Sequence, residues 1–524
     1  MTSNNTRRTV VVCGAGPTGL MLAAELRLAD VDVVILEKRP GGTDDRESRA
    51  PGVYARTVEI WDQRGILESF TGSRTGRYSH FALLPVGVDL GVLDSPHAVM
   101  LLPQARIERV LAERAAALGA EIRYGHAVTG LRQDEEAVEI EVTGPDGPYL
   151  LRAAYAVGCD GGRSTVRALT DVDFPGTDAT ADVLLADVSG ISRDLPGLKL
   201  HPFPFVRTGR GWMAVSAVAV SPSGEDVLRF IIGDSSRPPV RRAEAPSFAE
   251  VCEAAAAVAG IDLSGATPHW VSRFGNTTRQ AARYRIGRVL LAGDAAHVHP
   301  PFGGQGLNLG VQDAVNLGWK LAAEVHGRAP AGLLDSYERE RHPVAARVLL
   351  NTRAQNALMA PGPDIDALRT VFAESLEAPE VNERLAGELS AVDVRYDLGD
   401  AHPLVGMRMP HRELTTPDGR GTSTLRLLER ARGVLLDLSG DPGLKGAADG
   451  WAARVDTVAA TVTAVAATGG TDGPHGTEDD LAAVLIRPDG HVAWAAPRNR
   501  PVDLRALEAA LHRWFGPASA ADAR

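Results

Sequence analysis

Three glycines close to the amino terminus have the spacing of a dinucleotide-binding turn. Gly14, Gly16 and Gly19 form the pattern G-x-G-x-x-G. In this pattern the first glycine permits a tight turn, the second lets a pyrophosphate approach the backbone, and the third lets a helix pack close to a strand. Glu37 lies 18 residues beyond the last glycine, where a carboxylate can accept hydrogen bonds from a ribose 2′-hydroxyl. Because a carboxylate repels a 2′-phosphate, this site favours FAD or NAD over NADP.

The predicted elements around these residues follow the order strand, turn, helix, strand. The apolar run from Val10 to Cys13 predicts a buried parallel strand, and residues 20–29 predict a helix. The N–H groups and the dipole at the start of such a helix suit a phosphate. A second apolar run, Val33 to Leu36, ends directly before Glu37. Because all these features occur in register, a dinucleotide site is favoured over an ordinary strand-to-helix turn.

Two later stretches also place an aspartate after a buried strand. Residues 153–158 lead to Cys159-Asp160-Gly161-Gly162, and residues 284–292 lead to Gly293-Asp294. A loop of prolines and glycines follows Asp294 and leads into a helical pattern over 308–326. Its free backbone N–H groups suit a flat, electron-rich ring at the start of the helix. Three arginines, each either solvated or in contact with the cofactor, follow the second strand: Arg46, Arg49 and Arg56.

The composition is that of a globular protein without a nucleic-acid footprint. The chain has 524 residues, 44% hydrophobic and 23% charged, and a net charge of −11. It has no basic block and no apolar run of membrane-spanning length, so neither a nucleic acid nor a membrane is expected as a partner. The three cysteines form no C-x-x-C, which predicts neither a disulfide framework nor a metal site. The polar start MTSNNTRR lacks a signal-peptide pattern, and a cytoplasmic location is expected.

Periodicity divides the chain into four stretches. Residues 1–176 are predicted to form the first part of a nucleotide-binding domain, with residues 71–100 contributing to a substrate domain. Residues 177–277 form a β-rich substrate domain, residues 278–394 complete the first domain with long helices, and residues 395–524 form a separate small domain. Helices are predicted at 53–69, 105–118, 247–259, 334–360, 364–391 and 503–514. Strands are predicted at 80–84, 127–133, 136–143, 183–190, 212–220, 227–233, 434–438, 483–486 and 491–494.

Three motifs, taken in order, resemble those of the class A flavoprotein monooxygenases of the para-hydroxybenzoate hydroxylase type. They are G-A-G-P-T-G at 14–19, C-D-G-G-R-S-T-V-R at 159–167 and G-D-A-A-H-V-H-P-P at 293–301. Further segments are similar to the bacterial aromatic polyketide hydroxylases, at 61–67, 303–308, 312–321 and 484–495. That group includes angucycline and anthracycline hydroxylases, with rifampicin monooxygenases as close relatives. The resemblance covers the whole chain.

The resemblance implies an α/β fold with a Rossmann-like FAD-binding domain, an antiparallel β-sheet substrate domain and a C-terminal thioredoxin-like domain. All three cysteines precede residue 253, so this last domain cannot perform dithiol chemistry, and we expect it to have a structural or interface role. The resemblance also implies which residues bind the cofactor: Gly14, Gly16, Pro17, Gly19, Glu37, Lys38, Arg49, Gln104, Asp160, Gly161, Asp294, Pro301, Gly303, Gly304, Gly306, Leu307 and Asn308.

The resemblance further implies a reaction. NADPH or NADH docks transiently, reduces FAD and leaves, and the reduced flavin with O2 gives a C4a-hydroperoxide that an electron-rich phenolic ring attacks. The expected function is therefore hydroxylation of a polycyclic aromatic polyketide. Open alternatives are antibiotic inactivation of the rifampicin type, Baeyer–Villiger oxygen insertion and a non-catalytic flavin-binding protein. A homodimer is also left open.

No catalytic base is assigned from the sequence. Tyr54, Tyr78 and His80 lie in segments that could reach the substrate, but such side chains are more often packed or exposed. His297 and His299 are expected to shape the flavin loop through hydrogen bonds before any role in chemistry. Alternation along the strands selects four residues for the substrate pocket: Phe81, Leu83, Trp212 and Phe230.

Overall fold

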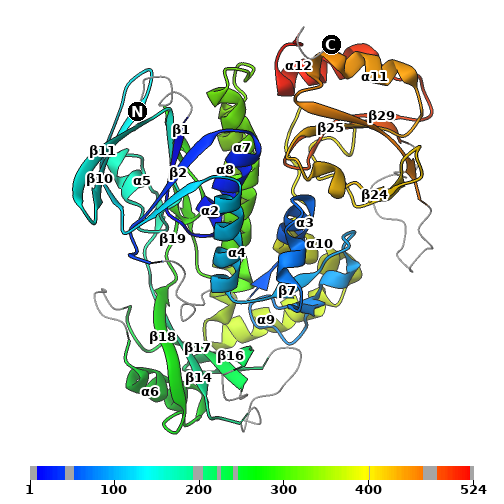
Figure 1. The fold of residues 1–524 in the computed structure, drawn as a ribbon. Helices are drawn as coiled ribbons and strands as arrows, with labels where there is room; N and C mark the ends of the chain where they lie inside the picture. Colours follow the sequence, from blue (N-terminus) through cyan, green and yellow to red (C-terminus); the bar gives the residue numbers. More distant parts are fainter. Residues whose placement is uncertain are drawn as a thin grey trace.

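The computed structural model of the protein describes residues 9–41, 52–192, 204–220, 226–239, 246–400, 402–463 and 481–519, leaving aside the side chains of 218–220 and 445. Figure 1 shows three regions: the amino-terminal sheet with long helices beside it, a second sheet below it, and the carboxy-terminal region to one side. Arg46 and Arg49 lie outside the described residues.

The amino-terminal sheet has six strands in the order β20-β21-β12-β1-β2-β8. Its strands are β1 (Thr9–Cys13), β2 (Asp32–Glu37), β8 (Glu121–Tyr124), β12 (Tyr155–Gly158), β20 (Arg285–Ile286) and β21 (Val289–Leu291). All neighbours pair in parallel except β20 with β21. The carboxyl ends of β1, β2, β12 and β21 therefore meet at one edge of the sheet, which is where ligands bind in doubly wound folds.

Helix α2 (Pro17–Leu28) is held between this sheet and α7 (Gly306–Val325) by close contacts at glycines. A Cβ on Gly19 would lie 2.1 Å from the Gly14 carbonyl oxygen. On α7, a Cβ on Gly310 would lie 2.3 Å from Thr18 Oγ1, and one on Gly318 would lie 2.5 Å from Glu25 Cβ. Because real Cβ atoms do not approach so closely, the two helices and β1 can pack at this separation only with glycine at these positions.

The other helices of this region are α3 (Ala55–Gln63), α4 (Gln104–Ala117), α5 (Thr165–Leu169), α8 (Asp335–Met359), α9 (Pro363–Leu376) and α10 (Pro379–Ser390). The predicted helix over 53–69 is shorter than expected, because the chain turns at Gly65 with a φ of +65°. The predicted stretch 364–391 is two helices, since Ala378 is extended before Pro379, which begins α10. A meander of β9 (Ala127–Gln133), β10 (Val138–Gly144) and β11 (Gly147–Ala153) confirms the strands expected at 127–143.

The second sheet is antiparallel, in the order β15-β16-β17-β14-β18. Its strands are β14 (Asp182–Ser189), β15 (Phe205–Thr208), β16 (Gly211–Val220), β17 (Asp226–Asp234) and β18 (Thr267–Gly275), and α6 (Phe248–Ala259) packs on one face. The strands predicted at 183–190, 212–220 and 227–233 are confirmed. The strand predicted at 80–84 is wrong, because Ala82 and Leu83 have φ values of +51° and +50° and form a turn.

The carboxy-terminal region has a four-stranded sheet in the order β26-β25-β28-β29. Its elements are β25 (Gly433–Asp437), α11 (Pro442–Ala448), β26 (Val455–Ala459), β28 (Leu481–Ile486), β29 (Val492–Pro497) and α12 (Leu504–Phe515). Strands β25 and β26 are parallel, whereas β28 and β29 form an antiparallel hairpin. This β-α-β unit followed by a hairpin and a helix is the thioredoxin-like arrangement that the resemblance implied.

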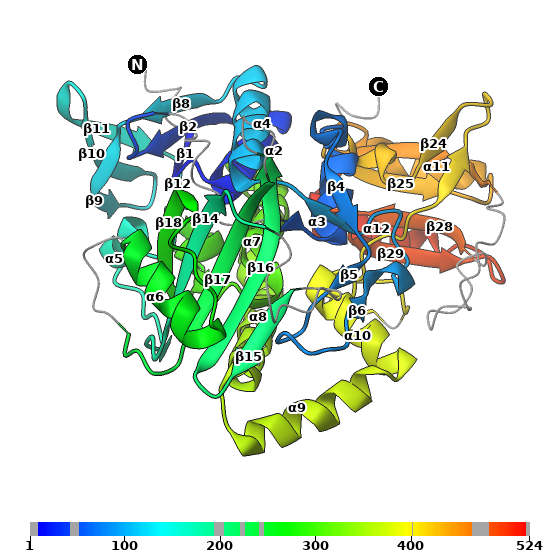
Figure 2. The same cartoon turned by 90° about the horizontal axis from the view of Figure 1, so that it is seen from below.

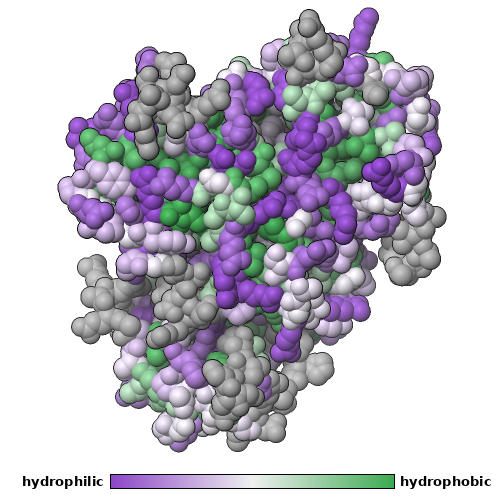
Figure 3. All heavy atoms as spheres, in the orientation of Figure 1, coloured by the Kyte–Doolittle hydropathy of each residue, from purple (hydrophilic) through white to green (hydrophobic). Residues whose placement is uncertain are grey.

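Short strands complete the structure: β3 (Gly52–Val53), β4 (Arg74–Gly76), β5 (Tyr78–Ser79), β6 (Val88–Asp89), β7 (Val99–Leu101), β13 (Gly176–Thr177), β19 (Thr278–Gln280), β22 (His297–Val298), β23 (Glu413–Thr415), β24 (Gly421–Ser423) and β27 (Thr461–Val462). Hydrophilic side chains cover most of the face drawn in Figure 3, with apolar side chains visible between them. Within the described ranges, no helix is long and apolar enough to cross a membrane, and no group of side chains could hold a metal ion.

The turn between β28 and β29 contacts α7 and α8 through buried charges. Arg487 donates to both carboxylate oxygens of Glu340 on α8, at 2.8 and 2.7 Å, and also pairs with Asp489. Lys320 of α7 donates to the same Glu340 at 2.7 Å. All four side chains are at most 6% exposed. The cluster joins the carboxy-terminal region to the helices behind the amino-terminal sheet.

We expect Arg487→Met to lower the free energy of unfolding by about 3–5 kcal/mol, because it leaves buried carboxylates without their main counter-charge. Burial opposes ionisation of Glu340, but Arg487 and Lys320 outweigh it and lower the pKa of Glu340 to about 2, from 4.5. The stabilisation is therefore present above pH 4.5 and lost as the pH falls towards 2. Guanidinium unfolding followed by circular dichroism at several pH values measures both effects.

The matched control is Arg384→Met, which removes an arginine whose side chain is 71% exposed from its pair with Glu388. An exposed pair contributes little, so this variant should unfold almost as the wild type does. Equal losses of unfolding free energy in the two variants would show that the buried cluster stabilises the protein no more than an exposed ion pair does.

Candidate active site

The first strand-to-helix turn of the amino-terminal sheet leaves open space beside Gly16. Gly14 has a φ of +109°, and a Cβ there would lie 2.4 Å from the Cys159 carbonyl oxygen. At Gly16, by contrast, no described atom lies within 4 Å of such a Cβ. Helix α2 begins directly after Gly16 without a side-chain cap. The N–H groups at the helix start and the free space fit a pyrophosphate, so this turn can accommodate the dinucleotide that the pattern implied.

The Glu37 carboxylate is tied to this turn. It accepts hydrogen bonds from the backbone N–H groups of Ala15 and Arg39, both at 2.9 Å, and it is 6% exposed. The Arg39 side chain also reaches Glu108, which accepts a hydrogen bond of 2.8 Å from Gln104. Gln104 is thus connected to the edge where an adenosine would lie. Binding of a ribose by Glu37, and of FAD by Gln104, remains a prediction.

Asp160 follows β12 and organises the start of α5. One carboxylate oxygen accepts from Ser164 Oγ at 2.5 Å, and the other accepts from the N–H groups of Thr165 and Val166 at 2.6 and 3.2 Å. Arg167 then donates to the Ala295 carbonyl oxygen at 2.8 Å. The motif therefore positions its own loop against the Gly293-Asp294 turn. A contact of Asp160 with FAD or a nicotinamide cofactor stays a prediction.

The loop before α7 provides a second helix N-terminus without a side-chain cap. Gly303 and Gly304 have φ values of +71° and +63°, which favour glycine. Asn308 donates to the Gly304 carbonyl oxygen at 2.9 Å and accepts from the Tyr54 N–H at 2.8 Å. Leu307 is half-buried beside it. The side chain of Asn308 is thus a structural tie, and contact of this residue with FAD remains a prediction.

A buried triad supports this loop from below. His297 Nε2 lies 2.7 Å from Asp313 Oδ2, and Arg341 Nε donates to Asp313 Oδ1 at 2.7 Å. Asp313 also accepts from the Gly293 N–H at 3.1 Å. His299 Nδ1 lies 2.8 Å from the Pro300 carbonyl oxygen. The prediction that the two histidines shape the loop through hydrogen bonds is confirmed. No pattern in the sequence indicated that Asp313 and Arg341 complete the network.

The remaining predicted cofactor residues differ in how exposed they are to solvent. Pro17, Gly161 and Gly306 are half-buried, whereas Lys38, Asp294 and Pro301 are exposed on loops at the same edge. Arg56 does not contact this edge. It is 2% exposed and donates to the Asp489 carbonyl oxygen at 2.7 Å, so it belongs to the interface with the carboxy-terminal region.

One of the three candidate bases lies beside the loop of Gly303 and Gly304. A Cβ on Gly304 would be 3.9 Å from the Tyr54 hydroxyl, which is hydrogen-bonded to Ser79 at 2.7 Å. Burial raises the pKa of Tyr54 to about 12. Burial also lowers the pKa of His80 to about 4, and Tyr78 is 46% exposed. Neither buried group has a pKa suited to proton abstraction at neutral pH.

An apolar cluster that includes Tyr54 and Phe302 borders the same loop. The rings of Trp212 and Phe274 meet Phe302 edge-on, with centroids 5.9 and 6.5 Å away. Phe81 and Leu83 belong to this cluster with Trp212. Phe230 does not, because it is paired with Val215 and packs on the α6 face. The prediction for Phe230 is corrected by the strand register: its neighbour Ile231 points towards the cluster.

The turn that carries Phe81 and Leu83 is strained. Ala82 and Leu83 are two successive residues other than glycine, and both adopt the left-handed conformation. Each such residue costs about 1–2 kcal/mol relative to an ordinary conformation. Surrounding contacts must therefore hold the turn in place.

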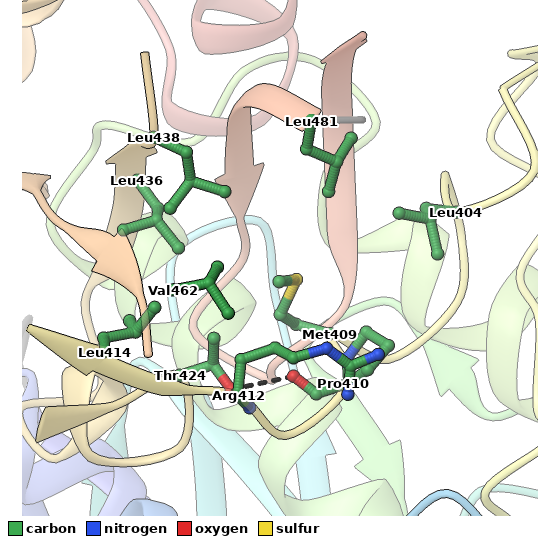
Figure 4. A pocket seen from close by; sticks show the side chains of 10 residues that line it. All are labelled: Leu404, Met409, Pro410, Arg412, Leu414, Thr424, Leu436, Leu438, Val462 and Leu481. Atoms are coloured by element: carbon green, nitrogen blue, oxygen red, sulfur yellow. Dashed lines mark hydrogen bonds between the residues drawn. The ribbon is translucent and has the colours of Figure 1, made fainter. Parts of the chain in front are cut away.

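A pocket in the carboxy-terminal region is not a second candidate for substrate. Figure 4 shows its mainly apolar wall of leucines, with Met409, Val462 and the hydrogen bond from Thr424 to Pro410. The cavity measures about 10 Å³, enough for about one water molecule. A polycyclic ring system does not fit there.

Two family models match the chain. The model described as FAD binding domain matches residues 7–352, and the model described as aromatic-ring hydroxylase, C-terminal, matches residues 402–518. The chain belongs to the FAD-dependent aromatic-ring hydroxylases. The resemblance drawn from the three motifs is therefore confirmed, and so is the assignment of the chain as an FAD-dependent aromatic monooxygenase.

Relatives match this hydroxylase along its length. The 12-dehydrotetracycline 5-monooxygenase/anhydrotetracycline 6-monooxygenase of Streptomyces rimosus is 47% identical over 519 residues, which cover 98% of this chain and 99% of the relative. Rifampicin monooxygenase of Streptomyces venezuelae is 45% identical, with the same coverage. The crystal structure of CabE, an aromatic hydroxylase from angucycline biosynthesis, matches with a TM-score of 0.87 and 47% identity over 98% of this chain and 99% of its own.

We expect Gly16→Ala to fold normally but to bind FAD at least about tenfold more weakly, because the added methyl enters the space for the pyrophosphate. Gly14→Ala should instead destabilise the protein itself, since its methyl would strike the Cys159 backbone. Fluorescence titration with FAD and thermal unfolding of the cofactor-free protein separate the two effects. Gly265→Ala, at an exposed position with open space, is the control. Wild-type FAD affinity in Gly16→Ala would contradict the assignment.

We expect Tyr54→Phe to leave the pH dependence of substrate turnover unchanged between about pH 6 and 9, because a phenol with a pKa of about 12 stays protonated there. Steady-state rates across this range measure the effect. If the variant loses an ionisation that the wild type shows, Tyr54 is a base and the assignment is wrong.

Proposed function

We propose that this hydroxylase adds one oxygen atom to a polycyclic aromatic polyketide, using NADPH or NADH and O2. The observation that supports the proposal best is the apolar cluster beside the loop before α7. Trp212, Phe274 and Phe302 gather there next to Gly303 and Gly304, where the ring of FAD would rest. Aromatic rings of this kind suit a flat, largely apolar substrate. The relatives named for tetracycline and angucycline chemistry support the same class.

When bound, FAD supplies the reduction of O2 and the transfer of one oxygen atom. The protein's own groups then have three tasks. Gly16 and the start of α2 hold the pyrophosphate, Asn308 and Tyr54 keep the loop before α7 in shape, and the apolar cluster orients the substrate and excludes water. None of these tasks needs a protein base, which agrees with the pKa values of Tyr54 and His80.

The nicotinamide cofactor requires a different site from FAD. Glu37 at the dinucleotide site disfavours a 2′-phosphate, so NADPH would not compete well for that position. We therefore propose that NADPH or NADH docks transiently outside this dinucleotide site, with the Asp160 motif as the predicted contact, and leaves after reduction. No dedicated nucleotide domain would be needed for such docking.

The test is NADPH oxidation by the FAD-loaded protein with and without anhydrotetracycline, an angucyclinone and rifampicin. We expect at least one tetracyclic phenol to raise the rate about tenfold or more, because the binding energy of the correct substrate can stabilise the transition state. Mass spectrometry of the product should show one added oxygen atom.

The possible results of this test distinguish between the alternative functions. Stimulation by rifampicin alone would favour antibiotic inactivation over biosynthetic hydroxylation. Insertion of the oxygen atom between a ring carbonyl carbon and its neighbour, giving a lactone, would favour Baeyer–Villiger insertion. Tight FAD binding without reduction by NADPH or NADH would refute the proposal and point to a non-catalytic flavin protein.

A further inference from the structure

The turn of Phe81 to Leu84 joins the predicted substrate cluster to two helices that are distant in sequence. Its strained residues, Ala82 and Leu83, leave two carbonyl groups pointing away from any strand ladder. Both carbonyls accept hydrogen bonds from one side chain, that of Arg369 on α9. Nη1 donates to the Ala82 oxygen at 2.7 Å, and Nη2 donates to the Leu83 oxygen at 2.6 Å.

The same guanidinium also caps the carboxyl end of α8. Arg369 Nη1 donates to the Leu358 carbonyl oxygen at 2.9 Å, so one buried group connects the turn with the last residues of that helix. Arg369 is 8% exposed, and no carboxylate of the described residues forms an ion pair with it. Burial, followed by the charge of Arg207, lowers the pKa of Arg369 to about 10. It therefore keeps its charge at neutral pH, and the three carbonyl dipoles stabilise that charge.

A second side chain connects the turn with the flavin loop. The Ala82 N–H donates to Gln355 Oε1 at 3.2 Å, while a Cβ on Gly303 would lie 3.0 Å from Gln355 Nε2. Gln355 itself is held by Asn351, to which it donates at 2.9 Å. Gln355 therefore links the turn to the loop that would carry the flavin ring.

Helix α9 holds the turn by packing as well. Phe372, one helical turn beyond Arg369, stacks on Phe81 with centroids 5.3 Å apart and an interplanar angle of 8°. Figure 2 shows α9 along the lower edge of the molecule, between the β15 end of the second sheet and α10. The helix therefore reaches the pocket wall from outside both sheets.

We propose that Arg369 is a positioning residue for the aromatic substrate, because it holds the strained turn that sets Phe81 and Leu83 against the flavin loop. The inference rests on the proposed function, since it assumes that the substrate occupies the cluster beside Phe302. Arg369 acts through the turn and touches neither the substrate nor the cofactor. Removing it should loosen one wall of the pocket while leaving the FAD site intact.

The experiment compares Arg369→Met with Arg207→Met in the FAD-loaded protein. Arg207 donates hydrogen bonds to the carbonyl oxygens of Met359 and Ala360 at the same junction of α8 and α9, but it does not touch the turn. It is therefore a matched control for loss of a cation at this junction. Three quantities are measured: hydrogen exchange of residues 80–84, the dissociation constant of anhydrotetracycline from the change in flavin absorbance, and the fraction of NADPH oxidation that yields hydroxylated product.

We expect Arg369→Met to retain its FAD, to speed hydrogen exchange at residues 80–84, and to bind anhydrotetracycline about tenfold more weakly, since hydrogen bonds to a charged donor are lost. The fraction of productive NADPH oxidation should fall as well, because a misplaced ring reacts poorly. Arg207→Met should leave all three quantities near the wild-type values.

A rescue variant separates positioning from general damage. Glycine adopts the left-handed conformation without a Cβ penalty, so Arg369→Met with Ala82→Gly should recover most of the substrate affinity. Affinity that stays low in the double variant, or an equal loss in Arg207→Met, would overturn the inference. Unchanged exchange at 80–84 in Arg369→Met, with normal binding, would do the same. If the wild type binds neither anhydrotetracycline nor an angucyclinone, the proposed function itself has failed.

Discussion

The close approach of α2 to both β1 and α7 is the constraint on which the rest of the structure depends. Gly14, Gly19, Gly310 and Gly318 leave no room for a Cβ, and the contacts they permit bring two uncapped helix starts to one edge of the parallel sheet. A larger residue at Gly310 or Gly318 would push α7 away from α2, and one at Gly14 or Gly19 would displace the turn after β1. The turns after β1, β12 and β21 then could not face a common ligand.

The carboxy-terminal region has no cysteine for dithiol chemistry, but it is important for the structure. With no cysteine beyond residue 252, it contributes a hairpin turn whose Arg487 and Asp489 are buried against Glu340, Lys320 and Asn316. Burying so many charges is favourable only when each is paired. The pairing ties α7 and α8 to this region, and α7 begins at the flavin loop. The interface role expected from the missing C-x-x-C therefore has a physical basis.

The substrate side shows where patterns in the sequence are weakest. Alternation correctly found the strands of the second sheet, yet it placed Phe230 on the pocket face, because one residue of error in register reverses every side chain. The apolar run at 80–84 also looked like a strand. Its turn conformation comes from Arg369 and Gln355, which lie more than 270 residues away in the chain.

The sequence by itself determined the dinucleotide turn, the order of the three motifs and the family, because each motif consists of residues that are close along the chain, with glycines where a Cβ would clash or would enter the space for a ligand. It also determined most helices and strands, which follow local periodicity. Only the tertiary structure decided that Arg56 joins an interface, that Asp313 and Arg341 support His297, and that a strained turn lines the predicted pocket. These features depend on partners from distant segments, and a side chain's partner is not encoded in its neighbours.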